Sequence, residues 1–293
     1  MYARSEIREF LISRRARLTP ASVGLPCYGY RRVPGLRREE VAVLAGISGP
    51  YYARLERGEM SKASDSVLNS LARALRLNDA ERAHLFDLAR AAHPASPAAR
   101  SQAGPTRVRP VIQQLLDAFT GAAAFVTNHR LDHLGANSLG YALCSPVFAE
   151  GVRTANLARY IFLDPGAPEF FTGWDNSATD VVADLRSSAG RNPHDDRLAG
   201  LIGELATRSD AFRVRWAAHD VKSPPSGVKT LNHPLVGEIE LNYEQLSLPS
   251  DPGLAIFTFS APAGSPAADS LAFLASWAGE QPRTVNESRS RTV

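Results

Sequence analysis

The stretch LRREEVAVLAGISGPYYARLERG, residues 36–58, contains two apolar patterns of helical spacing separated by a short turn. Gly46 is a natural terminator for the first helix, because glycine readily adopts the left-handed backbone that ends helices. Ser48 is a typical N-cap for the second helix, and Pro50 in its first turn loses only an N–H that has no helical partner. The stretch therefore predicts two helices joined by a tight turn, the anatomy of a helix-turn-helix motif.

The two predicted helices divide their residues between a buried seam and an exposed face. We expect the seam to contain the apolar residues Leu36, Val41, Leu44, Ile47, Tyr52 and Leu55. Positions 49, 50, 51, 53, 54 and 57 of the second helix are then left exposed. In helix-turn-helix proteins the N-terminal end of the second helix enters the major groove. This face therefore predicts a surface that binds double-stranded DNA.

The exposed residues of the second helix suit DNA in two ways. Gly49 and Pro50 have no side-chain donors and allow the backbone to come close to the duplex. Tyr51 and Arg54 are expected to read bases, since arginine pairs bidentately with guanine O6 and N7. Arg57, nearer the end of the helix, is expected to lie by a phosphate.

The distribution of charge also favours a polyanionic partner for the first third of the chain. Residues 1–100 hold 17 Lys and Arg against 10 Asp and Glu, a net charge of +7, whereas residues 101–293 carry −4. Arg37 and Arg38, at the start of the preceding helix, are expected to contact phosphates, which position a domain without specifying sequence. The predicted DNA-binding residues are Arg37, Arg38, Ser48, Gly49, Pro50, Tyr51, Arg54 and Arg57.

The length of 293 residues and the changes in pattern along the chain predict two domains. Residues 1–92 contain five amphipathic helical segments, and residues 93–108 form a linker rich in Pro, Ala, Ser and Gly. A second domain is expected over residues 109–278, followed by a polar tail at 279–293. In this second domain, two strand candidates at 123–128 and 130–137 are followed by several helices, then by three strand candidates at 227–233, 237–243 and 253–260 and a last helix. The prediction is an all-α domain followed by an α+β domain with one antiparallel sheet.

Residues 5–92 resemble the five-helix DNA-binding domain of the xenobiotic-response-element, or lambda-repressor-like, helix-turn-helix family. The string RLTPASVGLPCYGYRRVPGLRREEVAVLAGISGPYYARLERG, residues 17–58, resembles the MmyB-like branch of that family. The resemblance continues at 129–137, 160–174, 212–246 and 251–261, which are similar to the C-terminal ligand-binding domain of MmyB-like regulators. It implies a PAS-like α+β fold, a homodimer, and a pocket for a small apolar ligand, which is a fatty-acyl chain in at least one case.

Aromatic residues are abundant in the second half and suit such a pocket, because ligand sites are mostly apolar with a few polar anchors. The predicted ligand-binding residues are Asn137, Phe162, Trp174, Trp216, His219 and Tyr243. Asn137, His219 and Tyr243 would be the polar anchors. Asn137 follows a predicted strand and has the alternative of capping the next helix.

No catalytic, metal or cofactor site is expected. Neither a G-x-S-x-G nucleophile motif nor a glycine-rich phosphate loop occurs in the sequence. In a strand, His129 and His133 would share one face, but four residues span about 13 Å, too far for one ion, and only a loop would bring them together. The two cysteines have no metal spacing and suit a reducing compartment, and no apolar run is long enough for a membrane span. We therefore expect a cytoplasmic protein without membrane contact.

Together these features predict a sequence-specific transcription regulator that is not an enzyme. As a homodimer it would bind a pseudo-palindromic operator through its first domain and a small molecule through its second. Two alternatives remain open for the second domain. In the first alternative, the domain is only a dimerisation or protein-interaction scaffold. In the second, it is a sensor that carries haem or flavin.

Overall fold

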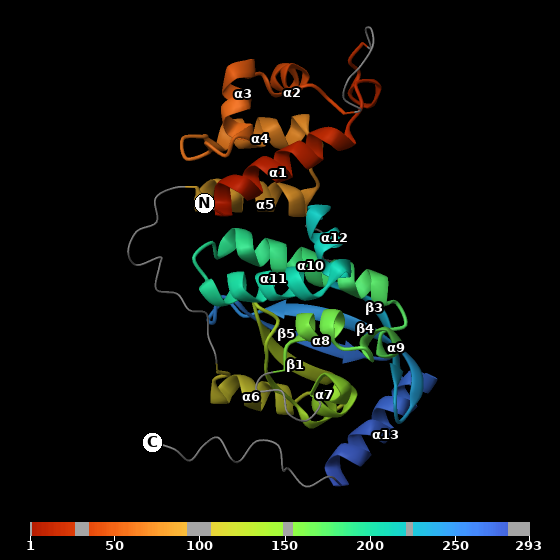
Figure 1. Ribbon diagram of the computed structural model, residues 1–293. Helices are drawn as coiled ribbons and strands as arrows, with labels where there is room; N and C mark the ends of the chain where they lie inside the picture. The colour runs from red at the N-terminus through yellow and green to blue at the C-terminus, as the bar shows by residue number, and fades with distance from the viewer. Residues whose placement is uncertain (1, 27–34, 93–106, 149–154, 221–224, 281–293) are drawn as a thin grey trace. The chain divides into compact units, whose positions relative to one another are not determined.

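The structure is a computed structural model that describes residues 2–26, 35–92, 107–148, 155–220 and 225–280 (Figure 1). Nearly all of the predicted linker and tail, and Cys27, lie outside the described residues. Among the helices in the described ranges, none is both long enough and apolar enough to cross a membrane.

By their contacts, the residues fall into two compact units whose boundaries differ from a simple division of the chain in two. The first unit contains Met1–Ala103 together with Thr179–Ser223. The second contains Gly104–Ala178 together with Pro224–Val293. A segment from the middle of the predicted α+β domain therefore groups with the helices of the predicted DNA-binding domain.

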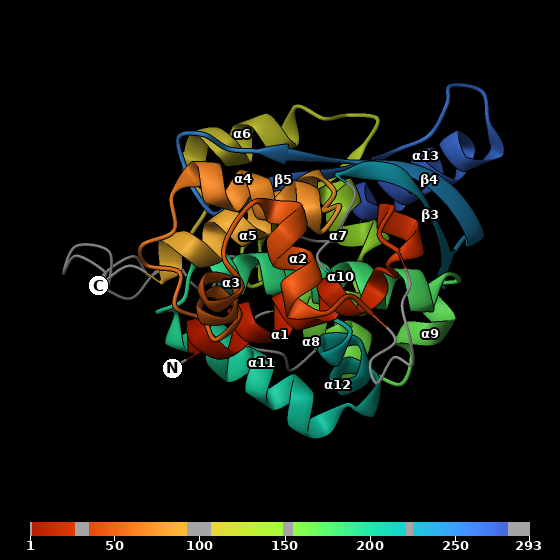
Figure 2. The same cartoon turned by 90° about the horizontal axis from the view of Figure 1, so that it is seen from above.

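The first unit contains the five helices that the sequence predicts for residues 1–92. They are α1 (Tyr2–Arg17), α2 (Arg38–Ala45), α3 (Gly49–Glu56), α4 (Asp65–Ala74) and α5 (Asp79–Ala91), with a 3-10 turn, η1, at Ala21–Val23. Helices α2 and α3 contact each other, and α1 contacts both α3 and α5 (Figure 2). The predicted seam is confirmed: Leu36, Val41, Tyr52 and Leu55 are fully buried, and Leu44 and Ile47 pack against the same core.

The turn between α2 and α3 has the predicted geometry. Gly46 ends α2 with a left-handed φ of 66°, and its N–H bonds back to the last turn of the helix. The side chain of Ser48 accepts a hydrogen bond from the backbone N–H of Tyr51 at 3.3 Å and so caps α3. Gly58 follows α3 at a φ of 87°, where a Cβ would lie 2.7 Å from the carbonyl oxygen of Arg4. The start of α3 is therefore fixed by a local cap, and the residue after its end by close packing against α1.

Three further helices complete the first unit. They are the long helix α10 (Trp174–Arg191), α11 (Asp196–Arg208) and α12 (Asp210–Ala217). Helix α10 begins in the second unit and continues without a break into the first, the division falling at Thr179. The chain therefore passes from the second unit to the first within α10.

The second unit is an α+β domain with one five-stranded antiparallel sheet, as predicted. The strands are β1 (Ala123–Asn128), β2 (His133–Ala136), β3 (Ser226–His233), β4 (Gly237–Ser247) and β5 (Leu254–Ser260), in the order β2-β1-β5-β4-β3. The helices are α6 (Pro110–Asp117), α7 (Ser138–Leu143), η3 (Ser145–Phe148), α8 (Leu157–Leu163), α9 (Ala167–Phe170) and α13 (Pro266–Glu280). All five strand candidates are therefore confirmed.

Strand β1, which lies between β2 and β5, is buried along its whole length, so both of its faces are covered. On one face, Ala124 and Val126 pack with Ile112 and Leu116 of α6 in an aliphatic core. Phe125 points to the opposite face, because side chains alternate along a strand. That second face carries aromatic rather than aliphatic side chains.

Candidate functional site

The DNA-binding surface predicted on α3 has its two arginines in the open. The side chains of Arg54 and Arg57 are 53% and 60% exposed, whereas Tyr52 is completely buried. Tyr51 is half-buried against the edge of the helical core. This surface therefore presents two guanidinium groups and part of one phenol ring, on a helix whose other side is fixed in the core.

Gly49, at the first position of α3, is not required by the packing of its own domain. A Cβ built at Gly49 meets no atom within 4 Å. By contrast, Gly35 is required, because its Cβ would lie 2.5 Å from the Cα of Ala16. The missing side chain at Gly49 leaves open space, which suits close approach of a partner to the start of the helix.

One exposed acid lies beside both arginines of this surface. Glu59 pairs with Arg54 at 3.2 Å and with Arg57 at 3.4 Å. The hydrogen bond from Arg54 is the main cause that holds the pKa of the Glu59 carboxyl below its usual value. A phosphate or base that contacts these arginines must therefore compete with Glu59.

A second acid, Glu56, ties α3 to the rest of its domain. Its side chain is only 1% exposed and accepts bonds from Arg15 of α1 at 3.0 Å and Arg38 of α2 at 2.8 Å. Burial alone would raise the pKa of Glu56, but the bonds from the two arginines outweigh it and lower this pKa. Arg38 remains 52% exposed, so it stays accessible to a phosphate while it holds Glu56. Arg37 is exposed at the N-cap of α2.

The second unit contains a row of aromatic side chains along one face of its sheet. Because paired residues on neighbouring strands share a face, the register aligns His133 (β2), Phe125 (β1), Phe257 and Phe259 (β5) and Tyr243 (β4). The ring centroids of Phe125 and His133 are 4.7 Å apart, and those of Phe125 and Phe257 are 5.7 Å apart. Lys229 of β3 extends the row, with its Nζ 5.2 Å from the centre of the Tyr243 ring.

The chain between β2 and β3 connects the two edges of this sheet. Asn156 forms a bridge with Asp132 at the β2 end, and Phe171 forms one with Leu231 of the edge strand β3. The segment between these bridges contains α8 and α9 (Figure 1). It supplies further aromatic residues, including Phe162, whose ring packs edge-on against Trp174 at the start of α10.

His133 is the most unusual side chain in this aromatic row. It is 8% exposed and lies between the stacked ring of Phe125 and the edge-on ring of Phe148. Neither of its ring nitrogens has a hydrogen-bond partner among the described residues. Burial lowers the pKa of His133 to about 4, so the ring is neutral at pH 7 and offers one donor and one acceptor. Buried polar atoms without partners are rare and point to a missing water, ion or ligand.

The predicted ligand-binding residues do not form one group. Phe162, Trp174 and Tyr243 lie in the second unit with the aromatic face. Asn137 takes the capping alternative that the sequence left open: its Oδ1 accepts from Gly140 N at 2.7 Å and from Ala124 N at 3.0 Å. Its Nδ2 donates to two more backbone carbonyls, so the polar atoms of Asn137 are occupied by the fold.

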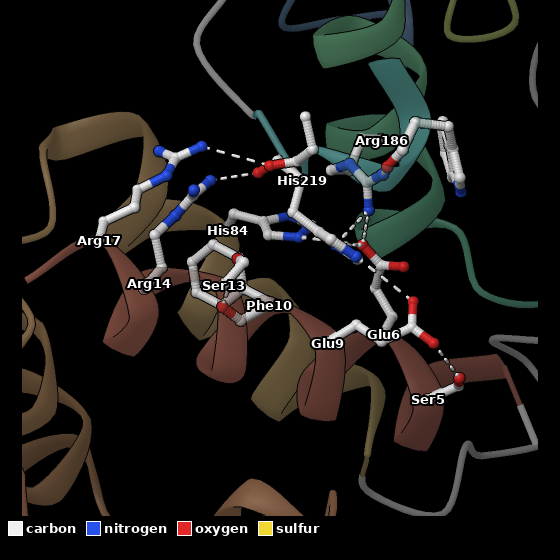
Figure 3. A network of polar contacts seen from close by, with 12 residues as sticks. Ser5, Glu6, Glu9, Phe10, Ser13, Arg14, Arg17, His84, Arg186 and His219 are labelled. Carbon is white, nitrogen blue, oxygen red and sulfur yellow. Dashed lines mark hydrogen bonds and ion pairs between the residues drawn. The ribbon is translucent and has the colours of Figure 1, made fainter. Parts of the chain in front are cut away.

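Trp216 and His219 belong to the first unit, whereas the strands belong to the second. There they join a buried cluster of charges with Arg186 of α10 and Glu6 of α1 (Figure 3). Sequence reasoning assigned them to the ligand because they lie within the segment similar to ligand-binding domains. It did not choose His133 as a ligand anchor, although an alternating strand pattern places that histidine on the same face as Phe125 (β1) once the pairing is known.

Two family profiles match the chain and divide it between the two functions. A helix-turn-helix domain profile matches residues 9–85, which contain α2 and α3. The profile of the MmyB-like transcription regulator ligand binding domain matches residues 108–274, more than half of the chain. A comparison with curated proteins gave no match. With a helix-turn-helix domain followed by this ligand-binding domain, the chain belongs to the MmyB-like helix-turn-helix transcription regulators.

Proposed function

We propose that this regulator reads a specific operator through α3 and responds to a small apolar molecule that carries one polar group. Two exposed arginines support the first part: Arg54 is in the last turn of α3 and Arg57 is its C-cap residue. One bidentate arginine–guanine pair contributes about 1–3 kcal/mol of discrimination against a wrong base. Arg37 and Arg38 then supply phosphate contacts from α2.

Gly49 offers a clean test of the DNA-binding geometry. Gly49→Ala adds one methyl group into open space and replaces glycine in a helix, so the domain should be no less stable. If DNA approaches the start of α3, the same methyl group meets the duplex and weakens binding. The measurement is fluorescence anisotropy with a duplex selected by the wild-type chain from a random pool. Unchanged affinity in a stable variant would place the duplex elsewhere.

The ligand class follows from the surroundings of His133, the single observation that carries this part of the proposal. The side chain of His133 is enclosed by the rings of Phe125 and Phe148, so the body of a ligand that reaches it is apolar. Its two nitrogens have no partner in the described residues, so the ligand has a group that can donate or accept a hydrogen bond. A carboxyl or hydroxyl group on an aliphatic chain satisfies both conditions, and a fatty acyl molecule is one example.

Native mass spectrometry of freshly purified protein, followed by organic extraction, tests the ligand. The expected result is an added mass of a few hundred daltons that extracts as an apolar molecule with a polar end. His133→Phe keeps an aromatic ring of similar size and should lose this mass, whereas Phe273→Tyr, on the exposed side of α13, should retain it. A bare polypeptide mass, from cells supplied with a mixed lipid extract, would refute a small-molecule role. A visible haem or flavin spectrum would instead establish a cofactor-bearing sensor.

The same spectra test the proposed homodimer. A dimer would present two copies of α3 to half-sites separated by one helical turn of DNA, about 34 Å, or a multiple of it. The selected operator should then be pseudo-palindromic. A monomeric mass together with an operator that lacks two-fold symmetry would contradict this part of the proposal. The proposed compartment is the cytoplasm, because a regulator that binds an operator must reach the chromosome.

A further inference from the structure

The first unit has a cluster of buried charges that connects α1 to α10 and to the residues after α12 (Figure 3). Arg186 of α10 is completely buried. One of its terminal nitrogens donates to the carboxylate of Glu6 and lies 2.9 Å from Nδ1 of His219. The other donates to the carbonyl oxygen of Trp216, whose ring lies 4.1 Å from the guanidinium carbon. One cation thus connects three segments that are far apart in the sequence.

His219 lies between the charged groups of this cluster. Its Nδ1 lies 2.9 Å from Arg186 and 3.5 Å from the carboxylate of Glu6. Its Nε2 lies 3.3 Å from the carboxylate of Glu9. The backbone carbonyl of His219 accepts a further bond from Arg14. Three side chains of α1, those of Glu6, Glu9 and Arg14, therefore face this histidine.

The residues beside His219 extend the same contact. Arg17 of α1 bonds to Asp220 at 2.6 Å and to the carbonyl oxygen of Ala218 at 3.2 Å. His219 itself has a φ of 55°, a left-handed conformation that is uncommon for a residue with a side chain. Such conformations persist where surrounding contacts determine them. The turn after α12 is thus held in one conformation by α1.

This contact is expected to separate only as a unit. Burial opposes the charge of Glu6, but its contacts with His219 and Arg186 outweigh burial and lower the pKa of this carboxyl. An ionised Glu6 and a buried Arg186 each need the other, because removing one partner leaves an uncompensated charge in the interior. Partial sliding of α10 along α1 would break the contacts of Arg186 with Glu6 and His219, and it would leave the charges of Glu6 and Arg186 out of reach of water.

Helix α10 also has contacts at its other end, in the second unit. Its first residue, Trp174, packs against Phe162 in the second unit and donates a hydrogen bond to the carbonyl of Ile161 at 2.9 Å. Arg186 lies twelve residues later on the same helix, about 18 Å along its axis. A helix transmits displacement along its axis, since its hydrogen bonds resist compression. Residues of the second unit and residues that contact α1 therefore belong to one continuous helix.

We propose that the Glu6–Arg186–His219 cluster is the joint through which α10 couples the ligand-binding unit to the DNA-binding helices. The inference rests on the proposed function, because it assigns the regulation of the same two sites. A ligand that shifts the start of α10 changes the position of Arg186, and with it α1, which packs directly on α3. By reciprocity, DNA bound to α3 must change the affinity for the ligand by the same factor, and in this proposal it does so through α10.

A metal ion is the rival occupant of this cluster. Glu6, Glu9 and His219 each present a ligand atom, all within 4.8 Å of one another. Arg186, however, already provides a positive charge between Glu6 and His219 and uses one atom of each. A divalent ion would have to displace this buried guanidinium. The geometry therefore favours a protein joint, and the experiment includes zinc as a competing outcome.

Hydrogen exchange of the full chain, with and without its selected duplex, tests the joint without knowledge of the ligand. In the wild-type chain, DNA should slow exchange in α3 and also, by about tenfold, in residues 179–191 of α10, a factor within ordinary allosteric couplings. Glu6→Gln keeps the shape of the side chain and removes its charge. In this variant DNA should still slow α3, but the change in α10 should be lost. Glu9→Gln is the matched control, since Glu9 is on the same helix and contacts His219 but is 54% exposed.

Each result has a definite meaning. Protection of α3 without any change in α10 of the wild-type chain would overturn the joint and leave the proposed function intact. No protection of α3 would refute the proposed function itself. An unchanged α10 response in Glu6→Gln would show that coupling takes another route. If Glu6→Gln fails to fold, the variant Glu6→Gln with Arg186→Met removes both charges and should fold without coupling. Calorimetry of the wild-type chain tests the rival metal site. Stoichiometric binding of Zn²⁺ that leaves the response of α10 to DNA unchanged would also overturn the proposal.

Discussion

Removal of the charge of Glu56 is expected to loosen the recognition helix from its domain. Glu56→Gln is close to isosteric, and the amide oxygen keeps one acceptor for the two arginines. Arg15 is 14% exposed and would be left as a largely buried cation whose acceptors among the described residues are neutral: the amide oxygen and the carbonyl of Leu36 at 2.7 Å. Breaking a buried pair costs about 3–5 kcal/mol, and we take about 3 kcal/mol because Arg15 keeps that bond. This is a large share of the roughly 5–15 kcal/mol that stabilises a domain.

The assay is native-state hydrogen exchange of residues 36–58 in the full chain, which reports the stability of α2 and α3 directly. Arg38→Ala is the comparison, because Arg38 also bonds to Glu56 but is 52% exposed, and an exposed pair contributes only about 0.2–1 kcal/mol. Acidification should act like the substitution. A pKa lowered in the folded state gives stability that is present above the unfolded value, near 4.5, and lost as the pH falls through the folded value. Equal exchange in wild type and Glu56→Gln would refute the argument.

Three further outcomes are expected. Glu59→Gln frees both arginines of α3 from their exposed acid, so affinity for any duplex should rise by about threefold at low salt, measured by anisotropy, and an unchanged affinity would contradict this. Asn137→Ala leaves four backbone groups without their partner and should lower the free energy of unfolding of the sheet unit by about 3 kcal/mol in urea titrations. Burial lowers the pKa of His84 and of His133 to about 4, so below pH 6.5 the unfolded chain binds protons that the folded chain does not. Stability should therefore fall by up to about 1.4 kcal/mol per pH unit for each histidine between pH 6.5 and 4, and a flat urea midpoint over this range would contradict it.

Local chemistry in the sequence was sufficient to predict the helix-turn-helix motif. Gly46 and Ser48 act on backbone groups within four residues, so their roles depend little on the rest of the chain. The strands were predictable for a similar reason, because alternation and turns are local. The start of α1 is less evident from local chemistry: the helix begins at Tyr2, and Ser5, a typical capping residue type, bonds to Glu9 within the helix.

Long-range pairing was not predictable in the same way. Arg186 and Glu6 are separated by 180 residues, and no local pattern indicates that they meet. Trp216 and His219 were therefore assigned to the ligand on the basis of their segment, although the structure groups them with the helical unit. The unpaired nitrogens of His133 also depend on tertiary packing, since they are unusual only once Phe125 and Phe148 enclose the ring.

The most direct test of the account compares Arg54→Ala with Arg57→Ala on the selected operator and on a scrambled duplex, across a range of salt concentrations. The two residues are well matched, since both are on or next to α3, both are more than half exposed and both pair with Glu59. Arg54→Ala should remove about 1–3 kcal/mol of preference for the operator. Arg57→Ala should weaken both duplexes equally and reduce the salt slope by about 1. An intact operator preference in Arg54→Ala would contradict the claim that α3 reads the sequence.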